Sequence, residues 1–193
     1  NDHLRYRKFR RNMNITKIRE FVEANPKLVG RRESIRHPGL FVLKYNRKVF
    51  YDNLWTPELM ETRGLVVDTN WNVIIYPFTK IFNRFENGTD FDPEENVFAA
   101  RKVNGFMACV TYYMNKNVVS TTGSLDSEYV TIAEKYIKDL NILPGFTYIF
   151  EICDPSDPHI VKEEPGAYLI GMRDLSRNKM MTEHYLDLEY PKK

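Results

Sequence analysis

Several common signals are missing from this 193-residue sequence, and each absence excludes a class of protein. Only two cysteines occur, Cys109 and Cys153, which are too few for a disulfide framework or a zinc-binding pattern. No apolar run reaches the roughly eighteen residues of a membrane span, and no apolar segment follows the basic N-terminus as in a signal peptide. We therefore expect a soluble cytoplasmic protein with two buried thiols.

Familiar catalytic motifs are missing as well. There is no glycine-rich phosphate loop ending in Lys-Ser/Thr, no Gly-x-Ser-x-Gly elbow and no His-Glu-x-x-His helix. The four histidines are scattered without ligand spacing, so we predict no metal site built from protein side chains alone. What remains is a set of Lys, Arg and Glu residues near predicted strand ends, which suits a polyphosphate with a divalent cation.

The length and the charge distribution set two further expectations. With 42% hydrophobic residues, the chain can build one sizeable core, which predicts a single domain over residues 1–193. Residues 1–48 hold 14 Lys/Arg and 4 Asp/Glu, whereas the remainder holds 14 and 22. The basic, aromatic segment at residues 5–11 would suit phosphates and bases, or it is a solvated terminus.

The periodicity predicts an α+β fold built on antiparallel sheets. A helix capped by Asn14 runs to Asn25-Pro26, and a second covers Ser127 to Leu140 with Asp126 as its cap. Between turn signals, the short β-branched and aromatic runs predict strands at 40–45, 64–68, 73–76, 106–113, 118–121, 148–153 and 167–172.

Lys102 is the candidate nucleophile. It lies in Arg101-Lys102-Val103-Asn104-Gly105, just before a predicted strand, and the glycine lets the backbone lie close to a ligand. The segment Lys102-Val103-Asn104-Gly105 resembles the Lys-x-Asp/Asn-Gly signature of covalent nucleotidyltransferases, which include ATP-dependent ligases and mRNA-capping guanylyltransferases. This resemblance implies a nucleotidyltransferase (adenylation) domain of antiparallel β-sheets flanked by helices.

Flanking segments narrow the resemblance to one branch of that superfamily. Residues 61–68 and 77–83 upstream, with 122–124 and 146–151 downstream, are similar in order and approximate spacing to RNA ligases of the T-even phage type. Fungal tRNA ligases share much of this pattern. The implied activity is ATP-dependent RNA ligation: Lys102 accepts AMP from ATP in the presence of Mg²⁺, AMP passes to an RNA 5′-phosphate, and a 3′-hydroxyl seals the strand. Cleaved tRNA is one implied substrate, and no membrane or obligate protein partner is implied.

The resemblance also implies roles for other residues. Arg63 would contact ribose or phosphates, although a salt bridge to Glu61 or Asp68 is the alternative. Lys80 would hold the triphosphate, and Phe82 would stack on adenine or simply pack in the core. The remaining implied nucleotide-binding residues are Tyr45, Asn104, Gly105 and Glu151.

The chain departs from the family pattern in three places. Asn104 replaces the aspartate of most ligases, and residues 120–123 lack the lysines that phage enzymes have there. No Glu-Gly-x-Val segment and no later Lys-x-Lys pair occur, so we expect a domain that lacks the family's C-terminal strands. Two alternatives therefore stay open: a catalytically idle RNA-binding module on the same scaffold, and an RNA-capping guanylyltransferase.

Overall fold

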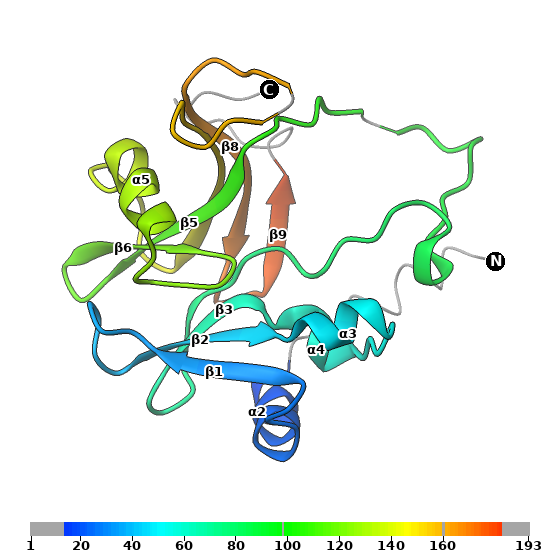
Figure 1. The fold of residues 1–193 in the computed structure, drawn as a ribbon, viewed down its shortest axis with the longest axis horizontal. Helices are drawn as coiled ribbons and strands as arrows, with labels where there is room; N and C mark the ends of the chain where they lie inside the picture. Colours follow the sequence, from blue (N-terminus) through cyan, green and yellow to red (C-terminus); the bar gives the residue numbers. More distant parts are fainter. Residues whose placement is uncertain (1–13, 98, 160, 183–193) are drawn as a thin grey trace.

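The computed structural model describes residues 14–97, 99–159 and 161–182. These residues form two antiparallel sheets, with strand orders β1-β2-β3-β4 and β6-β5-β7-β8-β9, together with a few helices (Figure 1). The predicted α+β class is therefore confirmed. The basic segment at residues 5–11 and the end of the chain lie outside the described residues.

The first sheet is built from β1 (Val29–Glu33), β2 (Leu40–Tyr45), β3 (Arg63–Asp68) and β4 (Val73–Ile75). Helix α2 (Ile15–Ala24) packs against it through Ile18 and Val22. As predicted, the side chain of Asn14 caps this helix by accepting a hydrogen bond from the Lys17 N–H. Two short helices, α3 (Arg47–Tyr51) and α4 (Pro57–Glu61), connect β2 to β3.

The second sheet is built from β5 (Phe106–Tyr113), β6 (Lys116–Thr121), β7 (Phe146–Cys153), β8 (Gly166–Asp174) and β9 (Lys179–Thr182). Helix α5 (Glu128–Ile137) covers one face with the buried residues Val130, Ala133 and Ile137. Met114 and Asn115, which join β5 to β6, both have positive φ, as a two-residue hairpin turn requires.

Apolar side chains from both sheets meet in a shared core. Val42 and Val66 of the first sheet belong to the same buried cluster as Cys109 and Ile149 of the second. Both cysteines are free and buried, as predicted, and burial raises the pKa of Cys109 to about 12. This thiol is therefore a packing residue rather than a nucleophile.

Polar contacts join the first sheet and its turns to the second sheet and its helix in at least two places. Arg173 of β8 is buried, donates from Nη2 to the Pro77 carbonyl at 3.1 Å, and lies 3.7 Å from the centre of the Tyr76 ring. In the turn between β1 and β2, the Ser34 hydroxyl donates to Asp126 at 2.7 Å, and Arg36 pairs with Glu134 of α5 at 2.7 Å. Helix α5 is therefore fixed to the turn between β1 and β2.

The prediction that Asp126 caps this helix was wrong. The cap position is Ser127, and the Asp126 carboxylate accepts backbone N–H bonds from Ile35 and Arg36 in addition to the Ser34 hydroxyl. The carboxylate therefore serves a distant turn rather than its own helix. Sequence spacing alone does not distinguish these two kinds of acceptor.

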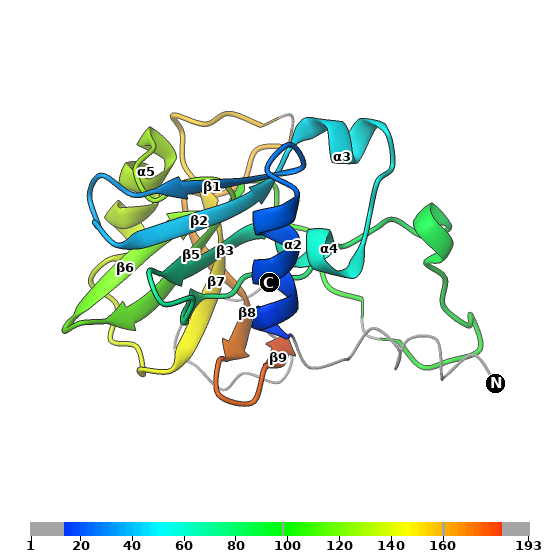
Figure 2. The same cartoon turned by 90° about the horizontal axis from the view of Figure 1, so that it is seen from below.

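A long segment between β4 and β5 leaves the two sheets and returns to them. It contains one short 3₁₀ helix, η1 (Glu86–Gly88), and extends to the side of the molecule in both views (Figures 1 and 2). Lys80 and Phe82 lie at its start, and Lys102 lies at its end. Within the described ranges, no helix is long and apolar enough to cross a membrane.

Candidate active site

The Lys102 loop is held by the residues on either side of the lysine. Val103 is buried and clusters with Cys153 of β7 and Tyr168 of β8, whereas Lys102 itself is exposed. Fixing Val103 in the core therefore leaves the neighbouring Lys102 on the surface side of the loop. A nucleophile needs this combination of a fixed backbone and an accessible amine.

Gly105 brings this loop against β7. Its backbone N–H donates to Oε1 of Glu151 at 3.0 Å, and a Cβ at this position would lie only 2.0 Å from the carbonyl oxygen of Ile152. Any side chain would force the loop away from β7. The glycine of the Lys-x-Asn-Gly segment is thus required by close backbone approach.

Glu151 is a half-buried carboxylate among positive charges. Burial raises its pKa, while the Gly105 hydrogen bond and the charges of Lys102, His159 and Arg63 oppose that rise. These interactions place Lys102 and Arg63 in the electrostatic neighbourhood of one carboxylate. Among the described residues, no group of three or more His, Cys, Asp or Glu side chains forms a metal-binding cluster.

Glu163 is a site residue that the sequence analysis missed. Its side chain is only 2% exposed, pairs with Arg101 at 2.6 Å, and accepts from the Asn104 N–H at 3.4 Å. The side-chain amide nitrogen of Asn104 lies 3.5 Å from Oε1 of the same carboxylate. Glu163 thus joins the Lys102 loop to the connection between β7 and β8.

A second group of predicted residues surrounds Trp55, which the sequence analysis did not single out. Its ring centre lies 4.8 Å from that of Tyr45 and 5.4 Å from that of Phe82. The Lys80 ammonium lies 4.5 Å from the centre of the Phe82 ring. Burial lowers the pKa of Lys80, the charge of Arg63 adds to that shift, and Glu86 opposes it.

Arg63 connects the two groups. It starts β3, its Nη1 lies 3.9 Å from the Met107 sulfur, and its charge acts on both Lys80 and Glu151. The alternative ion pairs are not formed among the described residues. Glu61 accepts from Tyr76 and Thr79, and Asp68 accepts from the Asn70 and Asn72 N–H groups of the next turn.

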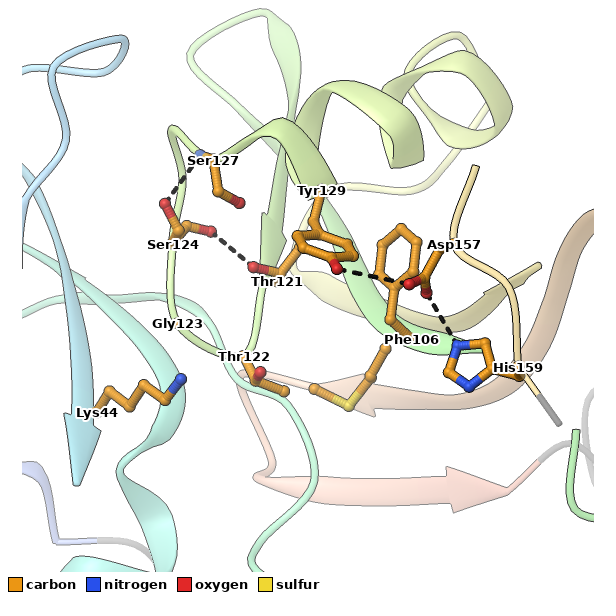
Figure 3. A pocket seen from close by; sticks show the side chains of 11 residues that line it. Lys44, Phe106, Thr121, Thr122, Gly123, Ser124, Ser127, Tyr129, Asp157 and His159 are labelled. Carbon is orange, nitrogen blue, oxygen red and sulfur yellow. Dashed lines mark hydrogen bonds and ion pairs between the residues drawn. The ribbon is translucent and has the colours of Figure 1, made fainter. Parts of the chain in front are cut away.

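A cavity of about 450 Å³ opens beside Met107, the register partner of Glu151 (Figure 3). Its walls come from the ends of β2 and β6, the start of β5, the N-terminal end of α5 and the connection between β7 and β8. The lining residues are Lys44, Phe106, Met107, Thr121, Thr122, Gly123, Ser124, Ser127, Tyr129, Asp157 and His159. None of the predicted site residues lines this cavity, although Gly105 directly precedes its lining residue Phe106 and Tyr45 directly follows Lys44.

Comparison with known proteins shows similarity to a phage enzyme. An RNA ligase of the Rhodothermus phage RM378 is 25% identical to this chain, over 76% of the chain and 46% of the phage protein. The chain therefore spans less than half the length of that relative. No protein-family model matches the chain. The similarity relates the chain to an RNA ligase at low identity.

Proposed function

We propose that this chain carries the adenylation domain of an ATP-dependent RNA ligase, with Lys102 as the residue that accepts AMP. The observation that carries the proposal is the attachment of the Lys102 loop to Glu151 through Gly105, with Arg63 acting on the same carboxylate. The similarity to a phage RNA ligase supports the class of reaction.

In the proposed first step, the Lys102 amine attacks the α-phosphorus of ATP. A nitrogen–phosphorus bond forms, the bond between the α-phosphorus and its bridging oxygen breaks, and pyrophosphate leaves, while the amine loses its proton to solvent. The positive charges of Arg63 and Lys80 favour this step because negative charge develops on the leaving group. Mg²⁺, bound mainly by the triphosphate and by one or two carboxylates such as Glu151, would supply further charge neutralisation.

The aromatic group suits the adenosine part of the nucleotide. Tyr45, Trp55 and Phe82 pack edge to face, and in the proposed complex the base would stack on one of these rings. Glu151 can accept a hydrogen bond from a ribose hydroxyl, because only one of its oxygens receives the Gly105 N–H. The backbone at Asn104 and Gly105 would hold the loop against the bound nucleotide.

The later steps are part of the same proposal. AMP would pass from Lys102 to the 5′-phosphate of an RNA, and the 3′-hydroxyl of a second end would displace AMP and join the strands. Cleaved tRNA supplies ends of this kind once its termini carry a 5′-phosphate and a 3′-hydroxyl. The charges of the described site suit this reaction because every intermediate carries phosphate groups.

Labelling with α-³²P nucleotides tests the proposal. The protein is incubated with labelled ATP or GTP and Mg²⁺, denatured, and examined for covalent label in the wild type, Lys102→Ala and Lys116→Ala. Lys116 is an exposed lysine of β6 and serves as the matched control. We expect label from ATP that is lost only in Lys102→Ala. Label from GTP would instead indicate a capping guanylyltransferase, and no label from either nucleotide would overturn both enzymatic functions in favour of an idle RNA-binding module.

A further inference from the structure

Lys44 is a lysine of the first sheet whose ammonium group lies at a wall made by the second sheet. It lies near the end of β2 and lines the cavity, and Figure 3 shows its Nζ directed toward the segment that contains Thr122 and Gly123. A Cβ at Gly123 would lie 2.7 Å from Nζ and 3.0 Å from Cδ of Lys44. The absence of a side chain at Gly123 therefore makes room for this lysine.

A close contact between the sheets fixes this placement. Gly64 of β3 has φ of +93°, and a Cβ there would lie 3.0 Å from Cα of Thr122. Lys44 and Arg63 are register partners on β2 and β3, immediately before Gly64. Packing Gly64 against Thr122 consequently places Lys44 in the cavity wall. Its neighbour Arg63 is outside the lining and reaches the cavity only through its contact with Met107, which does line it.

Neither of these two charges makes a close ion pair with a carboxylate among the described residues, although the charge of Arg63 acts on Glu151. Arg63 makes a contact of 3.9 Å with the Met107 sulfur, and Lys44 makes no ion pair within the described ranges. Like charges side by side on neighbouring strands destabilise a sheet, so an anion at this place would relieve a repulsion that the fold otherwise keeps.

The rest of the cavity fits the same ligand chemistry. The hydroxyl groups of Thr122 and Ser127 line it and can donate hydrogen bonds to an anion. Asp157, the one carboxylate in the lining, pairs with His159 at 2.9 Å, and both lie across the cavity from Lys44 in Figure 3. The Lys44 end is therefore the anion-binding end.

We propose that the Lys44 end of this cavity is a phosphate subsite, with Lys44 as the cation in its lining, the neighbouring Arg63 as a supporting positive charge, and the hydroxyls of Thr122 and Ser127 as its hydrogen-bond donors. The source of the phosphate depends on the proposed function: it is either the triphosphate of ATP or the terminal 5′-phosphate of an RNA. Both sources present the same oxygen acceptors, and Lys44 is the substrate-binding residue for either.

Equilibrium binding in a Lys102→Met background tests this subsite apart from the covalent chemistry. Two probes are titrated by calorimetry: Mg·ATP, and a short RNA with either a 5′-phosphate or a 5′-hydroxyl. The variants added to this background are Lys44→Met, which keeps the aliphatic chain, and Gly123→Ala, which displaces the ammonium without removing its charge. Lys48→Met is the matched control, since Lys48 is exposed on α3 and lies outside the cavity lining.

We expect Lys44→Met and Gly123→Ala each to weaken one probe by about tenfold, the effect of one lost hydrogen bond to a charged group. A loss for Mg·ATP assigns the subsite to the triphosphate, and a loss confined to 5′-phosphorylated RNA assigns it to the RNA end. The subsite would be overturned if Lys44→Met and Gly123→Ala both bind each probe with an affinity within about twofold of that of the background protein. It would also be overturned if no variant, the control included, binds either probe. The binding measurements do not require adenylylation, so they can be interpreted even if Lys102 takes up no label from ATP. If Lys102 is labelled but the binding affinities of the variants are unchanged, the subsite is overturned and the proposed function is not.

Discussion

The backbone N–H of Gly105 lies 3.0 Å from Oε1 of Glu151, across a sequence separation of 46 residues. This bond connects the loop that carries Lys102 with the middle of β7. It also gives a hydrogen bond to one oxygen of a carboxylate that burial partly removes from water. The position of the lysine thus depends on a backbone contact that only glycine allows.

Replacing Gly105 by alanine should separate the loop from β7. The added Cβ would lie 2.0 Å from the Ile152 carbonyl oxygen, so the backbone must move and the Glu151 hydrogen bond must break. We expect a loss of about 2 kcal/mol in the free energy of unfolding and loss of adenylylation. Urea unfolding measures the first, with Gly30→Ala as control because its Cβ would meet only ordinary contacts. Unchanged stability in Gly105→Ala would contradict the close approach.

Glu151→Gln should make the protein more stable and less active. Burial raises the pKa of Glu151, so the folded state binds this proton more tightly than the unfolded chain and the ionised carboxylate costs stability at neutral pH. The amide removes that charge and keeps an oxygen for the Gly105 N–H. We expect a gain of about 1 kcal/mol or less at pH 7, shrinking as the pH falls toward the carboxylate's raised pKa. Thermal unfolding from pH 7 to 4 checks this, with the exposed Glu94→Gln as control; a variant less stable than wild type at pH 7 would refute it.

Glu163→Gln should loosen the Lys102 loop with little change in overall stability. The substitution removes the ion pair with Arg101, which is 56% exposed, and leaves an acceptor for Asn104. Trypsin cleaves after Arg101 and Lys102, so we expect cleavage there to become roughly tenfold faster through local opening. The neighbouring exposed Glu164→Gln is the control, and equal cleavage rates in the two variants would show that Glu163 does not hold the loop.

Asp126 should account for part of the acid sensitivity of the fold. Burial alone would raise its pKa, but hydrogen bonds from the Arg36 N–H, the Ser34 hydroxyl and the Ile35 N–H outweigh that effect and lower it. The stability that this carboxylate contributes is therefore complete above its ordinary pKa of 3.8 and is lost as the pH falls through the lowered value. Between pH 6 and 3, Asp126→Asn should lose a few tenths of a kcal/mol less than the wild type, because solvent screens this partly exposed carboxylate. Asp139→Asn, exposed just after the end of α5, should follow the wild type. Parallel pH profiles for all three proteins would disprove this role.

Much of the fold could be predicted from local patterns because most strands bury alternate or continuous apolar residues. The bounds of β2 and β5 match the predicted strands, and β3 and β4 differ from theirs by one residue at one end. Neither β1 nor β9 was predicted, and in β1 only Val29 is buried while the other four residues are exposed. An edge strand of this kind carries no hydrophobic period, so only its pairing with β2 defines it.

The site was less predictable than the fold, since its geometry depends on contacts between distant segments. The resemblance led to Arg63, Lys80 and Lys102, but no local pattern indicated that Glu163 holds the loop or that Lys44 reaches Gly123. Both side chains lie in segments with ordinary strand and turn composition. Their roles follow from how β7 and β8 connect and from how closely Gly64 approaches Thr122.

Each sheet is made from one continuous stretch of the chain, and this has a consequence for synthesis. During translation, residues up to Lys102 are made before any of β7 exists, so the growing chain holds the proposed nucleophile without the carboxylate that accepts a hydrogen bond from its loop. We expect ribosome-bound chains ending before residue 146 to take up no label from ATP, and label in such chains would contradict this order. The order of the strands along the chain would then keep Lys102 unreactive until β7 has been made.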